Sequence, residues 1–191
     1  MESRLPSPKS NPRLRLFWGI QAAPELGARI GAWRRESRSV LPSARWPCLE
    51  DCHLTLAFLG GRPAQERDAI LAIGRDAVAS LDAFTLRTAG LGAFPSLRKA
   101  RILWLGFAAE PALARLASLL QRAMEPFGSA PEDGPFLPHL TLARFKDPIP
   151  LPVLAEIEAS TLAVGAIHLF QSCPEAEGPK YRILGTVTLN T

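Results

Sequence analysis

The chain has 191 residues, of which 47% are hydrophobic and 21% are charged, and its formal net charge is +4. These values are ordinary for a globular protein that forms one domain, or two small lobes that share a core. No apolar run approaches the ~20 residues that a membrane-spanning helix requires, which argues against such a helix.

In chain order, the first segment is a tail at residues 1–12, which is rich in proline and serine and has no apolar stretch. We expect this tail to be disordered and not to act as a secretory signal. The remainder, 13–191, is expected to form a single two-lobed domain in the cytoplasm. Apolar and aromatic residues predict a strand at 14–20, followed by a helix at 24–36.

The remaining elements are predicted from apolar periodicity and from the positions of proline and glycine. They are a strand at 53–61, a helix at 64–81, strands at 84–88 and 102–107 separated by a turn-rich segment at 90–96, a helix at 111–124, a loop at 128–138, a strand from 139, a short helix at 153–157, and strands at 164–170 and 181–189. Both halves of the chain therefore have nearly the same order of elements. This order predicts an α+β fold: a duplicated two-lobed structure with two antiparallel sheets that face a central groove and helices on the outer faces.

One tetrapeptide occurs at the start of two predicted strands, as His53-Leu54-Thr55-Leu56 and as His139-Leu140-Thr141-Leu142. Because successive strand side chains point to opposite faces, the histidine and threonine of each copy share one face, about 7 Å apart. The leucines then point toward a core. An ordinary half-buried strand explains one such copy well, but two copies favour a shared site for a small anion.

Two imidazoles and two hydroxyls around one anion are suited to acid–base chemistry on a phosphodiester. With an ordinary pKa of about 6.5, one imidazole can accept a proton while the other donates one. A Ser-His-Asp triad is less persuasive, because the chain has no G-x-S-x-G segment. The sequence also has no G-x-x-x-x-G-K-[ST] or G-x-G-x-x-G segment, so it gives no indication of a nucleotide cofactor.

The basic residues and the cysteines give weaker indications of function than the two tetrapeptides. Four of the 22 basic residues are lysines, which leaves 18 arginines; these suit phosphate binding, although a composition bias of the source genome explains them equally well. Cys48, Cys52 and Cys173 are an odd number without a secretory context, so we expect reduced thiols. A zinc site usually needs four well-spaced ligands, and we therefore expect no metal.

Further segments accompany the two tetrapeptides: Arg15-Leu16-Phe17, Trp46, Ala57-Phe58-Leu59-Gly60, Gly92-Ala93-Phe94-Pro95-Ser96, Arg101-Ile102-Leu103-Trp104, Ala143-Arg144, Leu169-Phe170-Gln171-Ser172 and Gly178-Pro179-Lys180-Tyr181. Together they resemble the two-histidine phosphoesterase superfamily. Within it, they resemble the bacterial and archaeal RNA 2′,3′-cyclic phosphodiesterases, also called 2′-5′ RNA ligases. The resemblance extends over nearly the whole chain after the tail.

The resemblance implies metal-free hydrolysis of a terminal 2′,3′-cyclic phosphate on RNA to a 2′-phosphate, without a cofactor. In that scheme His139 activates water and His53 protonates the departing 3′-oxygen. Thr55 and Thr141 hold the phosphate oxygens, and Arg144 adds positive charge that stabilises the transition state. The implied partner is an RNA with a cyclic phosphate end, tRNA fragments included; no membrane partner is implied, and we expect a monomer.

Two positions complicate this scheme. Strict alternation puts Arg144 on the face opposite His139, so the strand must end or bulge there, or the side chain must wrap around, for the arginine to reach phosphate. A solvated arginine at a strand end is the alternative. The family also often carries an arginine two positions before the aromatic residue of its second motif, where this chain has Gly134-Pro135-Phe136. We expect that difference to alter contacts to the nucleotide.

Four aromatic residues are candidates for stacking on the terminal base, although each can equally serve in packing: Phe17, Trp46, Phe136 and Tyr181. His168 has no threonine two residues on, and we interpret it as structural or as a surface residue.

Alternatives to hydrolysis of RNA ends remain open. The basic charge and the glycine at position 134 are compatible with a module that binds RNA ends without turnover. Ligation of tRNA halves through a 2′-5′ bond is the same chemistry in reverse, so one site could do both. A phosphoesterase for another small cyclic or 2′-linked nucleotide is a further alternative.

Overall fold

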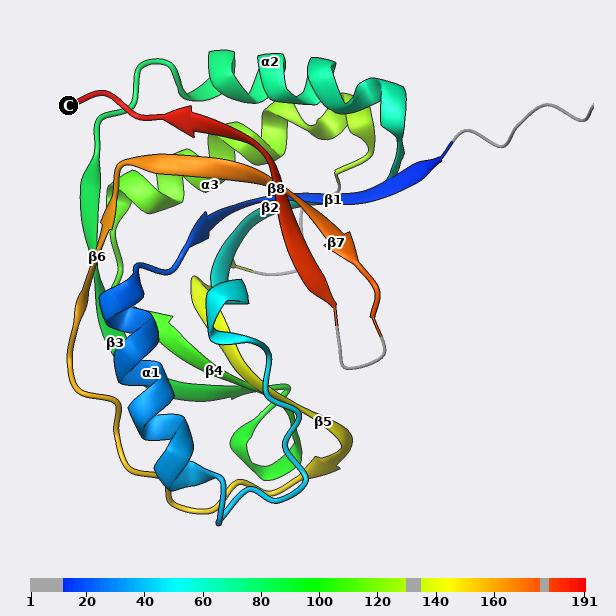
Figure 1. Cartoon of the computed structure of the whole chain (residues 1–191). Coiled ribbons are helices and arrows are strands. Elements are labelled where there is room, and N and C mark those ends of the chain that lie inside the picture. Colours follow the sequence, from blue (N-terminus) through cyan, green and yellow to red (C-terminus); the bar gives the residue numbers. More distant parts are fainter. Residues whose placement is uncertain (1–11, 130–134, 176–178) are drawn as a thin grey trace, which may run out of the picture.

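The structure is a computed structural model, which describes residues 12–129, 135–175 and 179–191 (Figure 1). The tail expected at 1–12 lies outside these residues except for Pro12. The elements in chain order are β1 (Arg13–Gln21), α1 (Pro24–Ser37), η1 (Leu49–Asp51), β2 (His53–Pro63), η2 (Ala64–Glu66), α2 (Arg67–Val78), β3 (Phe84–Phe94), η3 (Leu97–Lys99), β4 (Ala100–Phe107), α3 (Pro111–Ala123), η4 (Glu125–Phe127), β5 (His139–Ile149), β6 (Thr161–Val164), β7 (Ala166–Cys173) and β8 (Lys180–Thr188). None of the described helices is long and apolar enough to cross a membrane.

The strands form one curled antiparallel sheet in the order β6-β3-β4-β5-β2-β1-β7-β8. Its two central strands, β2 and β5, are joined where Leu54 pairs with Leu140. This junction divides the sheet into two halves of four strands each. The predicted α+β fold with two lobes is confirmed, and the two expected sheets are the halves of this one sheet.

The two halves of the sheet do not correspond to the first and second halves of the sequence. β3 leaves the first part of the sequence to pair with β4 and β6, and β7 returns to pair with β1. α2 and α3 lie together over the half that contains β1, β2 and β8, where Gln121 of α3 donates to the carbonyl oxygen of Leu56 at 3.0 Å. α1 lies beside the other half (Figure 1). The half-sheet β2-β1-β7-β8 is therefore built from both ends of the chain, whereas the strands of the half β6-β3-β4-β5 all come from its middle.

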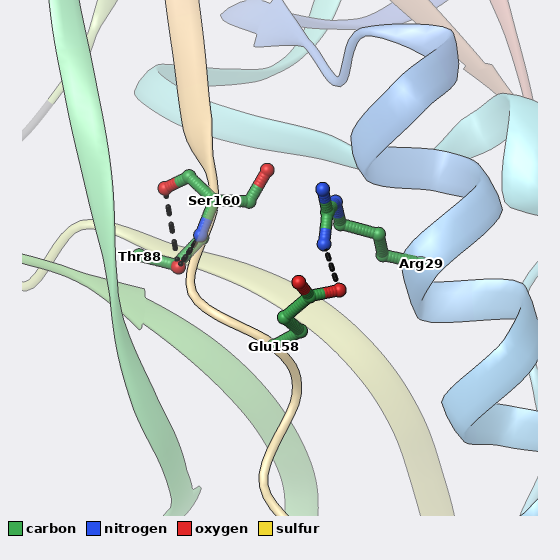
Figure 2. A network of polar contacts seen from close by, with 4 residues as sticks. All are labelled: Arg29, Thr88, Glu158 and Ser160. Atoms are coloured by element: carbon green, nitrogen blue, oxygen red, sulfur yellow. Dashed lines mark hydrogen bonds and ion pairs between the residues drawn. The ribbon is translucent and has the colours of Figure 1, made fainter.

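The short helix predicted at 153–157 is absent; the segment 150–160 instead runs between α1 and β3 (Figure 2). Its polar groups bond to neighbouring elements. The indole of Trp33 donates to the carbonyl oxygen of Ala155 at 2.7 Å, the backbone N–H of Ser160 donates to the hydroxyl of Thr88 at 2.9 Å, and Arg29 pairs with Glu158. These contacts replace the hydrogen bonds that a helix would have made within the segment.

The segment predicted as turn-rich at 90–96 is mostly strand. β3 continues to Phe94 and pairs with β4 as far as Ile102. The pairing shifts between Thr88 and Leu91, and Gly90 there has a φ of 89°, a conformation that favours glycine. The glycines of this segment predicted a turn, but Gly90 instead allows a β-bulge within β3.

Glycine also sets the distance between α2 and β1. A Cβ added at Gly74 would lie 2.2 Å from the indole of Trp18, which is 0% exposed, whereas Gly27 in α1 has nothing within 4 Å. We expect Gly74→Ala to lower the free energy of unfolding by about 1–3 kcal/mol, because the buried indole must move. Gly27→Ala should raise it by about 0.5–1 kcal/mol, because alanine loses less backbone entropy in a helix. Urea unfolding measures both changes; a change of the same sign in the two variants would contradict this packing.

Candidate active site

The two histidine–threonine pairs meet where the half-sheets join. The leucine pair at the junction is fully buried, with both side chains 0% exposed. Because the strands are antiparallel, this register places His53 beside Thr141 and Thr55 beside His139. All four side chains are half-buried, on the face opposite the leucines. The predicted group of two imidazoles and two hydroxyls therefore has an approximate two-fold arrangement.

A β-bulge in β5 turns Arg144 to the same face. The pairing of β5 with β4 shifts by one residue at Leu142. Leu142 and the next residue, Ala143, are both buried, whereas Arg144 is exposed. The extra residue reverses the alternation after it, so Arg144 lies on the face of His139. The sequence predicted that Arg144 could reach a phosphate on this face only if the strand ended or bulged, or if the side chain wrapped around, and the structure has a bulge.

β2 has the same irregularity at the equivalent position. Its pairing with β1 shifts at Leu56, and the residue in the place of Arg144 is Phe58, which is 41% exposed. The guanidinium of Arg15 in β1 lies 4.8 Å from the centre of the Phe58 ring. The two halves of the site thus share a backbone geometry but differ in the side chain that follows the bulge.

Both imidazoles are oriented in the same way. Nδ1 of His53 lies 2.6 Å from the carbonyl oxygen of Asp51, and Nδ1 of His139 lies 2.8 Å from the carbonyl oxygen of Leu137. A carbonyl oxygen only accepts, so each Nδ1 carries a hydrogen and donates it. In the neutral ring the lone pair is then on Nε2, which is free to exchange a proton with a ligand.

Aromatic rings surround His53. The ring centres of Tyr181, Phe17 and Phe170 lie 4.5, 4.7 and 5.6 Å from that of the imidazole. Phe17 is only 2% exposed and also stacks on Phe170 at 5.0 Å. Phe17 therefore packs against the imidazole and presents almost no ring surface to the solvent.

Burial lowers the pKa of His53 to about 4. The hydrogen bond to the carbonyl of Asp51 raises this pKa, and the nearby Arg144 and His139 lower it. His53 is therefore neutral at pH 7 in the free protein. This is the protonation state of a base, and an acid role requires a proton taken up when an anion binds.

The same shift predicts how stability depends on pH. Unfolding returns His53 to a pKa near 6.5, so between pH 6.5 and about 4 the unfolded chain binds a proton that the folded chain does not. This group should therefore stabilise the fold above pH 6.5 and lose about 3 kcal/mol of that effect as the pH falls to about 4. Urea unfolding across this range should give a flatter pH profile for His53→Gln than for the unsubstituted protein. Parallel profiles would contradict the lowered pKa.

A cleft of about 850 Å³ opens at this face, and His53, Thr141 and Arg144 line it together with Trp46 and Tyr181. The described residues that line it do not include Thr55 or His139, which belong to the same sheet face. A second hollow of about 320 Å³ shares His53 and Tyr181 with the cleft. There is room beside the imidazole of His53 for a nucleotide-sized ligand.

The expected aromatic residues divide into two groups. Tyr181 and Trp46 line the cleft; Arg34 lies 5.4 Å from the ring centre of Trp46. Phe136 is half-buried, packs against the core and does not line the cleft, and Phe17 is buried as described. Gly134, whose change was expected to alter contacts to the nucleotide, lies outside the described residues.

Sequence reasoning missed several residues of the cleft. The cations Arg34, Arg45, Lys146 and Lys180 line it. Arg45 had a signal available, because it directly precedes Trp46. The carbonyl groups that orient the two histidines could not be found from the sequence, because every residue has a backbone carbonyl.

The remaining histidine and the cysteines belong elsewhere. Nδ1 of His168 lies 2.9 Å from the hydroxyl of Thr186, and burial lowers the pKa of His168. His168 lines neither hollow, and its role as a structural or surface residue stays a prediction. Cys52 is buried, and burial raises its pKa to about 11. Among the described residues, no three of His, Cys, Asp and Glu are grouped so that they could hold a metal ion.

Comparisons with known proteins place the chain among named relatives. Residues 22–172 match the family described as the 2′-5′ RNA ligase superfamily. Proteins named RNA 2′,3′-cyclic phosphodiesterase are similar: that of Thermus thermophilus is 34% identical over 187 residues (92% of this chain, 90% of the relative), and that of Aeropyrum pernix is 32% identical over 145 residues (71% and 80%). The crystal structure of Escherichia coli LigT with 3′-AMP superposes with a TM-score of 0.81 at 28% identity, covering 94% of this chain and 99% of LigT. The structure of TT0787 from Thermus thermophilus gives 0.81 at 30% identity, covering 92% and 98%.

Proposed function

This chain belongs to the 2′-5′ RNA ligase superfamily, and from that membership we propose that it hydrolyses 2′,3′-cyclic phosphate ends of RNA to 2′-phosphates. Curated relatives more than 30% identical over most of the chain bear the name RNA 2′,3′-cyclic phosphodiesterase, which supports the reaction class. The proposed catalysts are His53 and His139 as a general acid–base pair.

One observation carries the proposal: two histidines, each beside a threonine of the opposite strand, have their Nδ1 atoms tied to carbonyl oxygens and their Nε2 atoms free. Packing alone does not call for two identical, outward-facing arrangements of this kind. A cyclic phosphate requires a proton acceptor on one side of phosphorus and a proton donor on the other, and the two-fold arrangement supplies both.

The bond changes can be assigned to these residues. His139 takes a proton from water as the water oxygen forms a bond to phosphorus. The bond from phosphorus to the 3′-oxygen breaks, and His53 gives its proton to that oxygen, which leaves a 2′-phosphate. Thr55 and Thr141 donate hydrogen bonds to the non-bridging oxygens, and the charge of Arg144 stabilises the negative charge that builds up on them.

The burial of His53 adds a step to this scheme. Its pKa of about 4 means that it is neutral before substrate binds. A bound phosphate brings a negative charge next to the imidazole, which favours the protonated form. When the substrate binds, His53 therefore takes up a proton, and it donates this proton to the departing 3′-oxygen as the phosphate loses its contact with that oxygen.

The two aromatic residues that line the cleft are the proposed contacts for the terminal nucleotide. Trp46 and Tyr181 both present part of a ring to the cleft. Bases of single-stranded RNA ends are often held by such rings, and stacking is worth about 1–3 kcal/mol per base. Phe136 does not line the cleft, and we assign it a packing role.

The test is an analysis of product ends. An oligoribonucleotide with a 2′,3′-cyclic phosphate is incubated with the protein in the presence of a chelator, and the products are compared with 2′-phosphate and 3′-phosphate standards by ³¹P NMR and mass spectrometry. We expect addition of one water and a 2′-phosphate end. A 3′-phosphate would overturn the assignment of the leaving oxygen, and a requirement for added metal would overturn the metal-free mechanism.

Two other outcomes correspond to other functions. Saturable binding of unchanged substrate would favour a module that binds RNA ends without turnover. A longer product with a 2′-5′ bond, formed when RNA with a 5′-hydroxyl is added, would place ligation on the same site. The description of the superfamily favours this second activity, because a 5′-hydroxyl can replace water as the group that attacks the same phosphorus, with the 3′-oxygen again leaving.

A further inference from the structure

Beyond the bulge, β5 is joined by a residue from the loop that follows α1. The backbone N–H of Arg45 donates to the carbonyl oxygen of Arg144 at 2.8 Å, and the N–H of Arg144 donates to the carbonyl oxygen of Arg45 at 2.9 Å. Residues paired in this antiparallel way point their side chains to the same face, with Cβ atoms about 5 Å apart. Two arginines are thus held side by side, and both line the cleft.

The row of cations continues along β5. Lys146 lies two residues after Arg144 and lines the same cleft, and Phe145 between them is buried. Both Arg45 and Lys146 are exposed to the cleft. Arg34 of α1 lines the cleft as well, is half-buried, and has its pKa lowered by burial.

These cations have no acidic partner among the described residues. Asp51 and Glu175 line the cleft, but Asp51 accepts the backbone N–H of Tyr181 at 3.3 Å and Glu175 pairs with Lys180 at 3.2 Å. None of the described carboxylates pairs with Arg45, Arg144 or Lys146. Like charges placed directly opposite each other on two strands repel, and bound anions reduce this repulsion.

We propose that Arg45 and Lys146 form a second phosphate site, which binds the phosphodiester that joins the terminal nucleotide to the rest of the RNA. This inference rests on the proposed function, in which Arg144 serves the reacting phosphate. The substrate class is then an oligonucleotide with at least one internal phosphodiester, and a cyclic mononucleotide lacks the group that this site recognises.

The test compares two dinucleotides with 2′,3′-cyclic phosphate ends, one with an ordinary internal phosphodiester and one with an uncharged methylphosphonate linkage. The unsubstituted protein should have a kcat/KM about 10-fold higher for the charged linkage, as expected for one charge-assisted contact. Arg45→Gln and Lys146→Gln should each bring this ratio close to one. Lys99→Gln, which changes an exposed lysine on η3, is the matched control and should keep the ratio.

A ratio near one in the unsubstituted protein would overturn the second site, and so would a ratio that stays high in both variants. An equal loss for the two dinucleotides would assign Arg45 and Lys146 to the reacting phosphate and overturn the proposal in that way.

Binding separates this inference from the proposed function. If neither dinucleotide is hydrolysed, the proposed function fails, and the second site is tested by the affinity for a tetranucleotide that ends in a 2′-phosphate. The slope of log Kd against log salt concentration should fall by about 0.7 in Lys146→Gln if one phosphate contact is lost. An unchanged slope in Lys146→Gln and in Arg45→Gln would overturn the second site.

Discussion

Alanine in place of either His53 or His139 is expected to lower kcat/KM for a 2′,3′-cyclic phosphate end by about 10²- to 10⁴-fold. Each substitution removes one of the two groups that exchange protons with the substrate through Nε2. The two act in one step, so the double variant should lose little more than the worse single variant. Losses that multiply in the double variant would contradict a concerted pair.

His168 provides the matched control. It is the third histidine, its Nδ1 meets the hydroxyl of Thr186, and it lines neither hollow. His168→Ala should change kcat/KM by less than about 3-fold, because it removes packing and not a proton donor. Circular dichroism and urea unfolding are used to check that each variant is folded. Full activity in both His53→Ala and His139→Ala would contradict the proposed chemistry.

The site was predictable to the extent that it depends on local strand geometry. A period of two placed His53 and Thr55 on one face, and the structure keeps that face half-buried above fully buried leucines. Repetition of the tetrapeptide then predicted that a second strand carries the same pair. Periodicity also located the long helices α1 and α3 to within a residue or two.

What could not be predicted depends on contacts between distant segments. The segment 150–160 has the composition of a short helix, but its polar groups find partners on α1 and β3, which no local pattern reveals. The bulge at Leu142 is set by the pairing of β5 with β4, so the sequence predicted only that some irregularity was required. Arg45 entered the site because its loop pairs with β5.

The crossing of the chain between lobes has the same origin. An apparent duplication in the order of elements suggested that each half of the sequence forms one lobe. Pairing of β3 with β6 and of β1 with β7 instead exchanges strands between the halves. A hydrophobic strand can pair with any strand that offers a suitable register. The order of the strands in the sequence therefore did not predict which strands are neighbours.

Arg144→Gln is expected to lower kcat for a cyclic phosphate end by about 10²- to 10³-fold, because one positive group aimed at the developing charge is lost. Arg87→Gln, which changes an exposed arginine of β3, is the matched control and should leave kcat unchanged within about 3-fold. Arg144→Lys should recover only part of the loss, since the ammonium group cannot form two parallel hydrogen bonds with phosphate.

A second measurement distinguishes electrostatic action of Arg144 from a merely structural one. Arg144 contributes to the lowered pKa of His53, so its removal should raise that pKa above about 4. NMR titration of the imidazole should detect this change in Arg144→Gln, and no change in Arg87→Gln. The acidic limb of the kcat/KM profile should move to higher pH in the same direction. If kcat falls while the pKa of His53 stays the same, Arg144 does not lie close enough to the site to act through its charge, and the role assigned to the bulge in β5 is wrong.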